Sequence, residues 1–516
     1  MDSSNYTDGQ TLDPYYPRTL LIPCADASEP LMSVLRRKTV ISPAGSATAL
    51  ERSLTATDLM LLGVGATIGA GIFVLTGIVA ATQAGPAIVL SFVLAGFACG
   101  CAALSYAELA SSIGGCGSAY GYAYASLGEL PAWIIGWMLL CEYMVSVPAV
   151  ATGWSAYVGS GLKAIGIVLP PSLMHGPFDP RSPGLIDLSA ALIVMVMGVL
   201  LGFGAKISSQ FNAIIVAVKV SAIGLFIFIA ARHVNVSNWT PFIPPQIIDA
   251  DGIRHFGISG VVTGAASIFF AYLGFDAVAT AAEETRNPSR DLPFGMLGSL
   301  LVCTTLYILV SGLLTGIVHY TELNVASPVA EGLVRIGRSW AAGLISIGAI
   351  AGLTTAILAM YFGASRILYA ISRDGLLPGV FSYVHPKTHT PLGAIVLAGI
   401  VTTLFAGFVP LGRLAEIASI GTLGAFVVVC SGVLMLRVTQ PNLQRPFRAP
   451  WSPLFPALGI LSCGYLMIML SRHTWIAFGT WMTIGLVVYA MYGYSNSRRA
   501  AAASELQLGR APSGNE

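Results

Sequence analysis

The sequence predicts an all-α polytopic membrane protein with twelve transmembrane helices. Its 516 residues are 55% hydrophobic and 10% charged, and the mean hydropathy is +0.76. Soluble domains usually carry about 25% charged residues. The polar stretches between the apolar windows are too short to form a soluble domain, so nothing indicates a catalytic domain outside the membrane. The net charge of +2 gives no sign of a nucleic-acid partner.

Twelve apolar windows follow one another along the chain, and a helix needs about 20 mainly apolar residues to cross a bilayer. Several of the windows exceed that length, which predicts tilted or extended helices. The windows lie near 59–84, 87–111, 131–162, 185–204, 211–231, 257–282, 292–318, 340–371, 392–409, 414–436, 454–471 and 475–494.

Lysine and arginine are distributed unevenly between the two sides that these spans define. With the N-terminus inside, sixteen of the 26 fall on inner segments and eight on outer segments, while Lys219 and Arg366 lie within spans. Cytoplasmic loops are enriched in these residues. We therefore expect both termini in the cytoplasm, with the first span acting as an uncleaved anchor.

The first span contains glycines at positions that weaken a helix. Its stretch from Leu62 to Phe73 carries Gly63, Gly65, Gly69 and Gly71, and each interior glycine costs about 1 kcal/mol relative to alanine. One interpretation is a small-residue packing face, because Gly65 and Gly69 have the spacing of a GxxxG motif. The other is a break in the helix whose freed backbone groups serve a binding site.

The sixth span has a matching interruption. Aromatic residues surround Gly274, and Asp276 follows directly. Asp276 suits the N-cap of a new half-helix, with a direct ligand role as the alternative. Broken helices at corresponding positions of two halves indicate an inverted repeat with a binding site near the midplane. A packing face in span one predicts no such partner, so the pair of interruptions favours the binding site.

These stretches resemble the amino acid–polyamine–organocation permeases, and most closely the cationic amino acid transporters and their bacterial homologues. The resemblance runs from about Leu54 to Tyr494. It is carried by the segments 65–73, 105–110, 117–120, 269–288 and 366–375.

The resemblance implies a five-plus-five inverted repeat (LeuT-like) with discontinuous helices 1 and 6, in which spans one, two, six and seven rock against a scaffold. It divides the chain into a cytoplasmic tail (1–53), a transport core of spans one to ten (54–438), spans eleven and twelve (439–495) and a second cytoplasmic tail (496–516).

The two interruptions supply backbone groups that suit the two charged ends of an amino acid. N–H groups that begin the second half of span one form a positive dipole end, which favours a carboxylate. Carbonyl groups that end the first half-helices favour an ammonium. The candidate residues are Gly69, Ala70 and Gly71 for the carboxylate, and Thr67, Phe270, Ala271 and Leu273 for the ammonium. Many relatives have Thr or Ser where this chain has Ala70, so one hydroxyl contact is expected to be missing.

Lys219 lies alone in the apolar fifth span, where an ionisable residue is costly unless it is paired or functional. Its position midway along the span argues against an ammonium that reaches the membrane surface. The resemblance places it against the break in span one, where sodium-coupled relatives hold Na⁺. We therefore expect Lys219 to couple transport to protons, and no sodium requirement.

Glu142 is a second isolated charge, in the middle of span three. The resemblance assigns it to the pocket for the substrate side chain, where a buried carboxylate would pair with a guanidinium or ammonium. The alternative is an internal hydrogen-bonding role. Glu108 and Arg366, near the inner ends of spans two and eight, are interpreted as gate residues or structural ion-pair partners.

Together these features predict a secondary active amino acid transporter in the plasma membrane, and not an enzyme. We expect a proton-coupled symporter that imports cationic or small neutral L-amino acids. Its expected partners are the substrate, protons and the lipid bilayer. No ATP-binding motif, metal-ligand spacing or Ser–His–Asp arrangement is present, so no cofactor is expected beyond the proton gradient. The alternatives are an exchanger, a sodium-coupled symporter and a transporter-like nutrient receptor.

Overall fold

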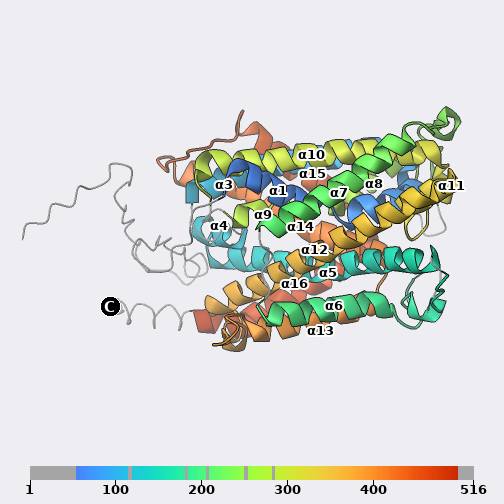
Figure 1. Ribbon diagram of the computed structural model, residues 1–516. Helices are drawn as coiled ribbons and strands as arrows, with labels where there is room; N and C mark the ends of the chain where they lie inside the picture. Colours follow the sequence, from blue (N-terminus) through green and yellow to red (C-terminus); the bar gives the residue numbers. More distant parts are fainter. Residues whose placement is uncertain are drawn as a thin grey trace, which may run out of the picture.

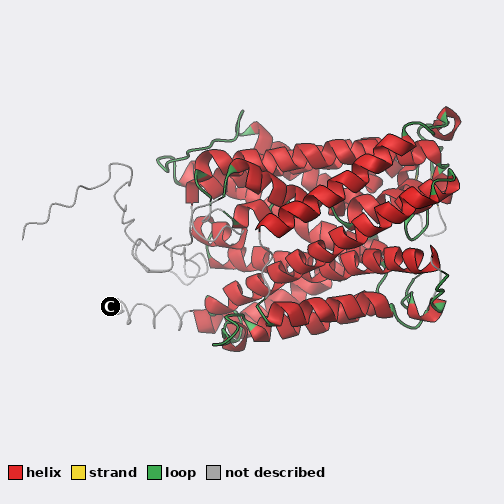
Figure 2. Ribbon diagram, in the orientation of Figure 1, coloured by secondary structure: helices red, strands yellow, loops and turns green. Residues whose placement is uncertain are grey.

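The computed structural model describes residues 54–113, 119–164, 166–179, 184–204, 209–248, 254–281 and 285–497. Most of this part of the chain is helical, as Figure 2 shows, with loops between the helices. The helices are α1 (Ala56–Thr67), α2 (Thr76–Val79), α3 (Ile88–Ile113), α4 (Ala119–Ser126), α5 (Glu129–Ala164), α6 (Leu188–Gly202), α7 (Ser209–Ala230), α8 (Gly257–Ile268), α9 (Ala277–Thr280), α10 (Pro288–Ile317), α11 (Pro328–Arg335), α12 (Ser339–Arg373), α13 (Leu392–Phe408), α14 (Leu411–Thr439), α15 (Leu454–Ile468) and α16 (Arg472–Val488).

Shorter elements complete the chain. Two strands of two residues each, β1 (Ile247–Ile248) and β2 (Arg254–His255), pair antiparallel, which the all-α prediction did not include. The remaining turns are π-helical at Gly71–Leu75, Ala80–Ala84 and Tyr489–Gly493, and 3₁₀ at Gly85–Ala87, Pro171–Leu173, Val236–Trp239, Phe269–Tyr272, Tyr320–Glu322 and Gly379–Phe381.

The long helices run side by side between two ends of the molecule (Figure 1). We call these the α4 end and the α11 end, after the short helix that lies at each. The long helix α5 packs against both α12 and α14, whereas α10 packs against α1 and α3. The helix pair α6 and α13 also packs together. Other helices therefore surround α1, so the break at the end of α1 is buried.

A helix lies in each of the twelve predicted windows. Within the described residues, seven helical segments are long and apolar enough to cross a membrane, and five apolar ones are shorter. The protein is therefore a multi-pass membrane protein, while twelve crossings and the inverted repeat stay predictions. The sequence did not indicate α4 or α11. Both have only 8 residues, and α11 is too polar on one face to register as an apolar window.

The last helix is held to α5 by a reciprocal pair of indoles. The Trp137 Nε1–H donates to the Trp481 carbonyl at 2.8 Å, and the Trp481 Nε1–H donates to the Trp137 carbonyl at 2.9 Å. Their rings stack with centroids 4.8 Å apart. Buried indole N–H groups need an acceptor, so these two residues fix both the contact and the register of α16 along α5.

Candidate functional site

The first helix is interrupted where its glycines predicted a break. The helix α1 ends at Thr67, Ile68 takes an extended conformation, and a π-helical turn starts at Gly71. The first N–H groups of a helix have no partner inside it, and here they belong to the buried stretch from Gly69 to Gly71. The break thus offers several main-chain donors within the protein.

The second interruption occurs between α8 and α9. A 3₁₀ turn covers Phe269–Tyr272, Leu273 is extended, and Gly274 has φ of 113°. That backbone conformation favours glycine. A Cβ at Gly274 would also lie 2.8 Å from the Ala66 carbonyl carbon. Gly274 therefore permits both the turn and its close approach to α1.

The two breaks are in direct contact. A Cβ added at Gly71 would lie 2.3 Å from the Cβ of Ala271 and 2.4 Å from its Cα. The seven candidate residues of the breaks, Thr67, Gly69, Ala70, Gly71, Phe270, Ala271 and Leu273, therefore belong to two adjoining buried segments. In addition, the Thr67 hydroxyl is buried and has no hydrogen-bond partner in the described residues.

Tyr307 joins the two breaks, and the sequence did not reveal it. From α10, its hydroxyl lies 2.9 Å from the Thr67 carbonyl and 2.7 Å from the Ala271 carbonyl. The Phe270 carbonyl accepts from the Leu273 N–H at 3.2 Å. Three of the four carbonyls predicted to receive an ammonium therefore already have a partner in this structure. A buried tyrosine must find an acceptor, but its sequence position alone does not name one.

Lys219 points into the protein and not toward the membrane surface. Its side chain is 1% exposed, and its Nζ donates to the Gly65 carbonyl at 2.8 Å and to the Ile68 carbonyl at 3.2 Å. These carbonyls belong to the last turn of α1 and its cap, which a helix leaves without partners. The lysine therefore ties α7 to the first break.

A glycine on α12 makes space for this lysine. A Cβ at Gly352 would lie 2.7 Å from Cε and 2.8 Å from Cγ of Lys219. The side chain is thus confined between α1, α7 and α12 along its whole length. Its ammonium can reach the first break only because position 352 has no side chain.

Glu142 lies in a buried polar region between α5 and α14. It is 1% exposed, hydrogen bonds Thr422 and interacts electrostatically with Asp276, yet its Oε2 has no partner in the described residues. The same holds for the buried hydroxyls of Tyr106, Ser146 and Ser419. Ser146 is one turn from Glu142 on α5, and Ser419 is one turn from Thr422 on α14. Buried polar atoms normally have partners, so this region can accommodate a polar ligand group or water.

Two interpretations of charged residues need correction. Asp276 precedes α9, but its side chain makes no capping hydrogen bond, because α9 is a single short turn that begins with its N-cap already in a helical conformation. Arg366 stacks on the Phe362 ring at 4.8 Å and is exposed. It makes no ion pair with a described residue, so the ion-pair interpretation of Arg366 was wrong. The acids Glu283 and Glu284 lie outside the described residues.

Glu108 does form a buried ion pair, at the α4 end. Arg437 donates to it from Nε at 2.9 Å and from Nη2 at 2.5 Å. The Ala449 N–H donates to Glu108 Oε2 at 2.8 Å, and Arg445 Nε lies 3.5 Å from Oε1. Bidentate Arg–carboxylate pairs are geometrically specific. This cluster therefore connects α3 to the end of α14 and the loop that follows it.

Comparisons with known proteins agree with these features. The chain matches the family described as amino acid permease over residues 54–490. The branched-chain amino acid permease BcaP of Bacillus subtilis (strain 168) is 46% identical over 471 residues, which cover 90% of this chain and 99% of that protein. The methylthioribose transporter of the same strain is 44% identical over 469 residues with equal coverage.

A plant relative extends the comparison. The vacuolar cationic amino acid transporter 4 of Arabidopsis thaliana is 38% identical over 393 residues, which cover 76% of this chain and 64% of that protein. All three are named as permeases or transporters and none as an enzyme.

Proposed function

This chain belongs to the amino acid permease family, and from that premise we propose that it is a secondary active transporter that imports L-amino acids by alternating access. The proposal includes twelve crossings, a five-plus-five inverted repeat, a plasma-membrane location and cytoplasmic termini. It also includes proton-coupled symport. The observation that carries the proposal is the direct contact between the two broken helices at Gly71 and Ala271.

The substrate carboxylate would bind the first break. Main-chain N–H groups of Gly69, Ala70 and Gly71 start a helix, where donors are free and the dipole favours an anion. The unpartnered Thr67 hydroxyl adds a possible side-chain donor beside them. This hydroxyl partly offsets the one that Ala70 lacks.

The substrate ammonium would bind carbonyls of both breaks, from Thr67, Phe270, Ala271 and Leu273. The Tyr307 hydroxyl lies within hydrogen-bond distance of two of them and can donate its one proton to either. A carbonyl has two lone pairs, whereas a hydroxyl has one proton to donate. An ammonium with three donors would therefore either share these acceptors or displace the tyrosine. The hydrogen bonding of Tyr307 would then differ between the empty and the occupied site.

The substrate side chain would extend toward Glu142. Its free Oε2 and the unpartnered hydroxyls of Tyr106, Ser146 and Ser419 favour a side chain that can donate hydrogen bonds. A cationic side chain satisfies the most of them, and a small neutral side chain would leave the space to water. This reasoning supports the cationic and small neutral classes.

Lys219 would couple transport to protons. Its ammonium donates to the carbonyls of Gly65 and Ile68, the place that the family resemblance gives to Na⁺ in sodium-coupled relatives. Burial penalises the charged form, so release of the proton would release the tie between α7 and the break. The proton gradient would then be the only driving force required.

Uptake into proteoliposomes tests the proposal. The purified protein should accumulate amino acids when the exterior is acidic and sodium is absent. Empty liposomes that take up nothing while preloaded ones exchange would identify an exchanger, and dependence on Na⁺ would identify a sodium symporter. Binding without any uptake would indicate a receptor.

A second candidate substrate should be tested in the same uptake assay. A relative of similar identity is named a methylthioribose transporter, and that sugar has neither the carboxylate nor the ammonium that the breaks suit. Uptake of methylthioribose without uptake of any amino acid would overturn the proposed function.

A further inference from the structure

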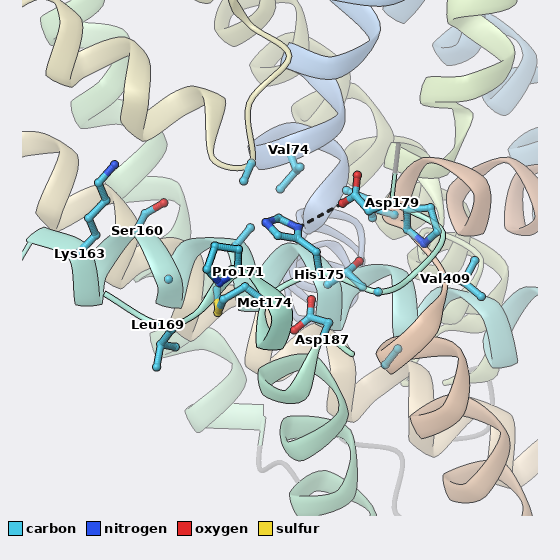
Figure 3. A pocket seen from close by; sticks show the side chains of 18 of the residues that line it. Val74, Ser160, Lys163, Leu169, Pro171, Met174, His175, Asp179, Asp187 and Val409 are labelled. Carbon is cyan, nitrogen blue, oxygen red and sulfur yellow. Dashed lines mark hydrogen bonds and ion pairs between the residues drawn. The ribbon is translucent and has the colours of Figure 1, made fainter. Parts of the chain in front are cut away.

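A cavity of about 410 Å³ lies at the α11 end, away from the contact between the breaks. Pockets for small organic molecules typically measure about 300–1,000 Å³. Figure 3 shows side chains from several elements pointing into this space. They come from the end of α5, the segment 167–179, the end of α13 and the start of α14.

The inner wall of the cavity adjoins the first break. Val74 lines it, and Val74 belongs to the π-helical turn that starts at Gly71. A Cβ at Gly153, beside the lining residue Thr152, would lie 3.1 Å from the Ala70 Cβ and 3.4 Å from Val74 Cγ2. The cavity wall at Val74 therefore lies about one helical turn from Gly71 of the candidate substrate site.

The two charged residues of the lining that are buried are both acidic. Asp179 and Asp187 are each 6% exposed, His175 Nδ1 lies 3.3 Å from Asp179 Oδ2, and both groups interact electrostatically with Asp187. Figure 3 shows His175 between the two carboxylates. Lys163, the other basic residue of the lining, is exposed.

Asp187 is held rigidly. Its Oδ1 accepts from the Ser155 hydroxyl at 2.6 Å and from the Ala190 N–H at 3.0 Å, where it caps α6. A charge fixed in advance binds a ligand at a lower entropic cost. A recess whose buried charges share one sign also concentrates ions of the opposite sign.

We propose that this cavity is an entry chamber that binds the ammonium group of an amino acid before the substrate reaches the broken helices. The inference rests on the proposed function for its role in transport. Its ligand class, a primary ammonium, follows from the lining itself. Val74 and the small residues around it form the inner wall that must move for the substrate to pass.

The first experiment measures binding of a primary amine to the purified full chain in nanodiscs. The probe is 3-methylbutylamine, followed by saturation-transfer difference NMR, with 4-methylpentanoate as the carboxylate of matched shape. Because the first break also offers donors to a carboxylate, the two probes are compared in the Gly71→Val variant, where the amine should bind and the carboxylate should not. Asp187→Asn should weaken amine binding about three- to tenfold, the effect of one lost charge interaction. Asparagine remains a good N-cap, so α6 should stay intact.

The control is Glu322→Gln, which removes a negative charge from an exposed residue at the same end, outside the cavity lining. It should leave amine binding unchanged. Equal amine binding by the Asp187→Asn and Glu322→Gln variants would overturn the proposal. Equal binding of the amine and the carboxylate by the Gly71→Val variant would overturn it as well.

Gly71→Val separates the chamber from the central site. It blocks the contact between the breaks but lies outside the cavity lining, so amine binding should persist in it. Loss of amine binding in a folded Gly71→Val protein would place the amine at the breaks and refute the chamber. If the unaltered chain transports no amino acid but binds the amine in an Asp187-dependent way, the proposed function fails and the chamber stands.

A second experiment fills the cavity. Ala156 lines it from α5, whereas a Cβ at Gly161, five residues along the same helix, meets no atom within 4 Å. Ala156→Trp should reduce uptake at least tenfold and lower amine binding, while Gly161→Trp should do neither. Equal uptake by the two variants would contradict a role for this cavity in entry.

Discussion

The two helix breaks lie against each other, but different groups hold them. At the first break, the ammonium of Lys219 satisfies the carbonyls of Gly65 and Ile68. At the second, the Tyr307 hydroxyl, which also reaches the Thr67 carbonyl, bonds Ala271, and Leu273 closes the turn on Phe270. An ammonium can lose its charge with a proton, whereas a tyrosine hydroxyl is neutral at physiological pH. If transport is coupled to protons as proposed, the first break is therefore where we expect the response to protons.

The largest effect is expected where the breaks touch. Gly71→Val should abolish amino acid binding, because a Cβ at this position already lies 2.3 Å from the Ala271 Cβ. Radiolabelled substrate binding to the purified protein measures this, with thermal unfolding as the check on folding. Gly224→Val is the matched control, since a Cβ at Gly224 would meet no atom within 4 Å. Substrate binding by Gly71→Val at the affinity of the unaltered chain would separate the breaks from the substrate.

Removing the charge at the first break should uncouple transport. Lys219→Met should lose accumulation driven by an acidic exterior in sodium-free liposomes, because no proton is then carried at Gly65 and Ile68. Exchange of substrate at equal concentrations should persist in part. Lys387→Met, at an exposed lysine, serves as the control. Undiminished proton-driven accumulation in Lys219→Met would remove the proposed distinction between the breaks.

A selective effect is expected beyond the second break. Glu142→Gln should raise the KM for arginine roughly tenfold relative to that for alanine, because a charge-assisted hydrogen bond of about 1.4 kcal/mol is lost. Uptake of both substrates by the same variant supplies its own control. Equal losses for arginine and alanine would leave Glu142 with a structural role.

The smallest effect is expected from removing the uncharged hydroxyl of Tyr307. Tyr307→Phe removes one hydrogen bond to the carbonyls of Thr67 and Ala271, worth about 1 kcal/mol, so affinity should change about fivefold. The pH dependence of uptake should keep the shape seen with the unaltered chain. A shifted pH profile in Tyr307→Phe would show that the second break also takes part in proton coupling.

The sequence predicted the features that follow from the types of residue within one local stretch of the chain. Glycines and a lone lysine in apolar windows indicated the breaks and the unusual position of Lys219, because such residues are costly in a membrane helix. The windows also matched the helices to within a few residues.

Features that depend on distant partners were not predictable. Tyr307 is 240 residues from Thr67, and Arg437 is 329 residues from Glu108. Nothing local tells a buried tyrosine or arginine which acceptor it will meet. The capping role of Asp276 failed for a related reason, since the length of α9 is set by tertiary packing and not by its own few residues.

Gly352 has no binding role of its own, yet we expect it to tolerate no substitution. A methyl group there would meet the Lys219 side chain at 2.7 Å. In a scan of every single substitution, we expect Gly352 to be as intolerant as Lys219, with alanine already harmful. Variants at this position are expected to fold but to lose the response to the proton gradient. The distance of Gly352 from the substrate site would give no reason to expect this phenotype.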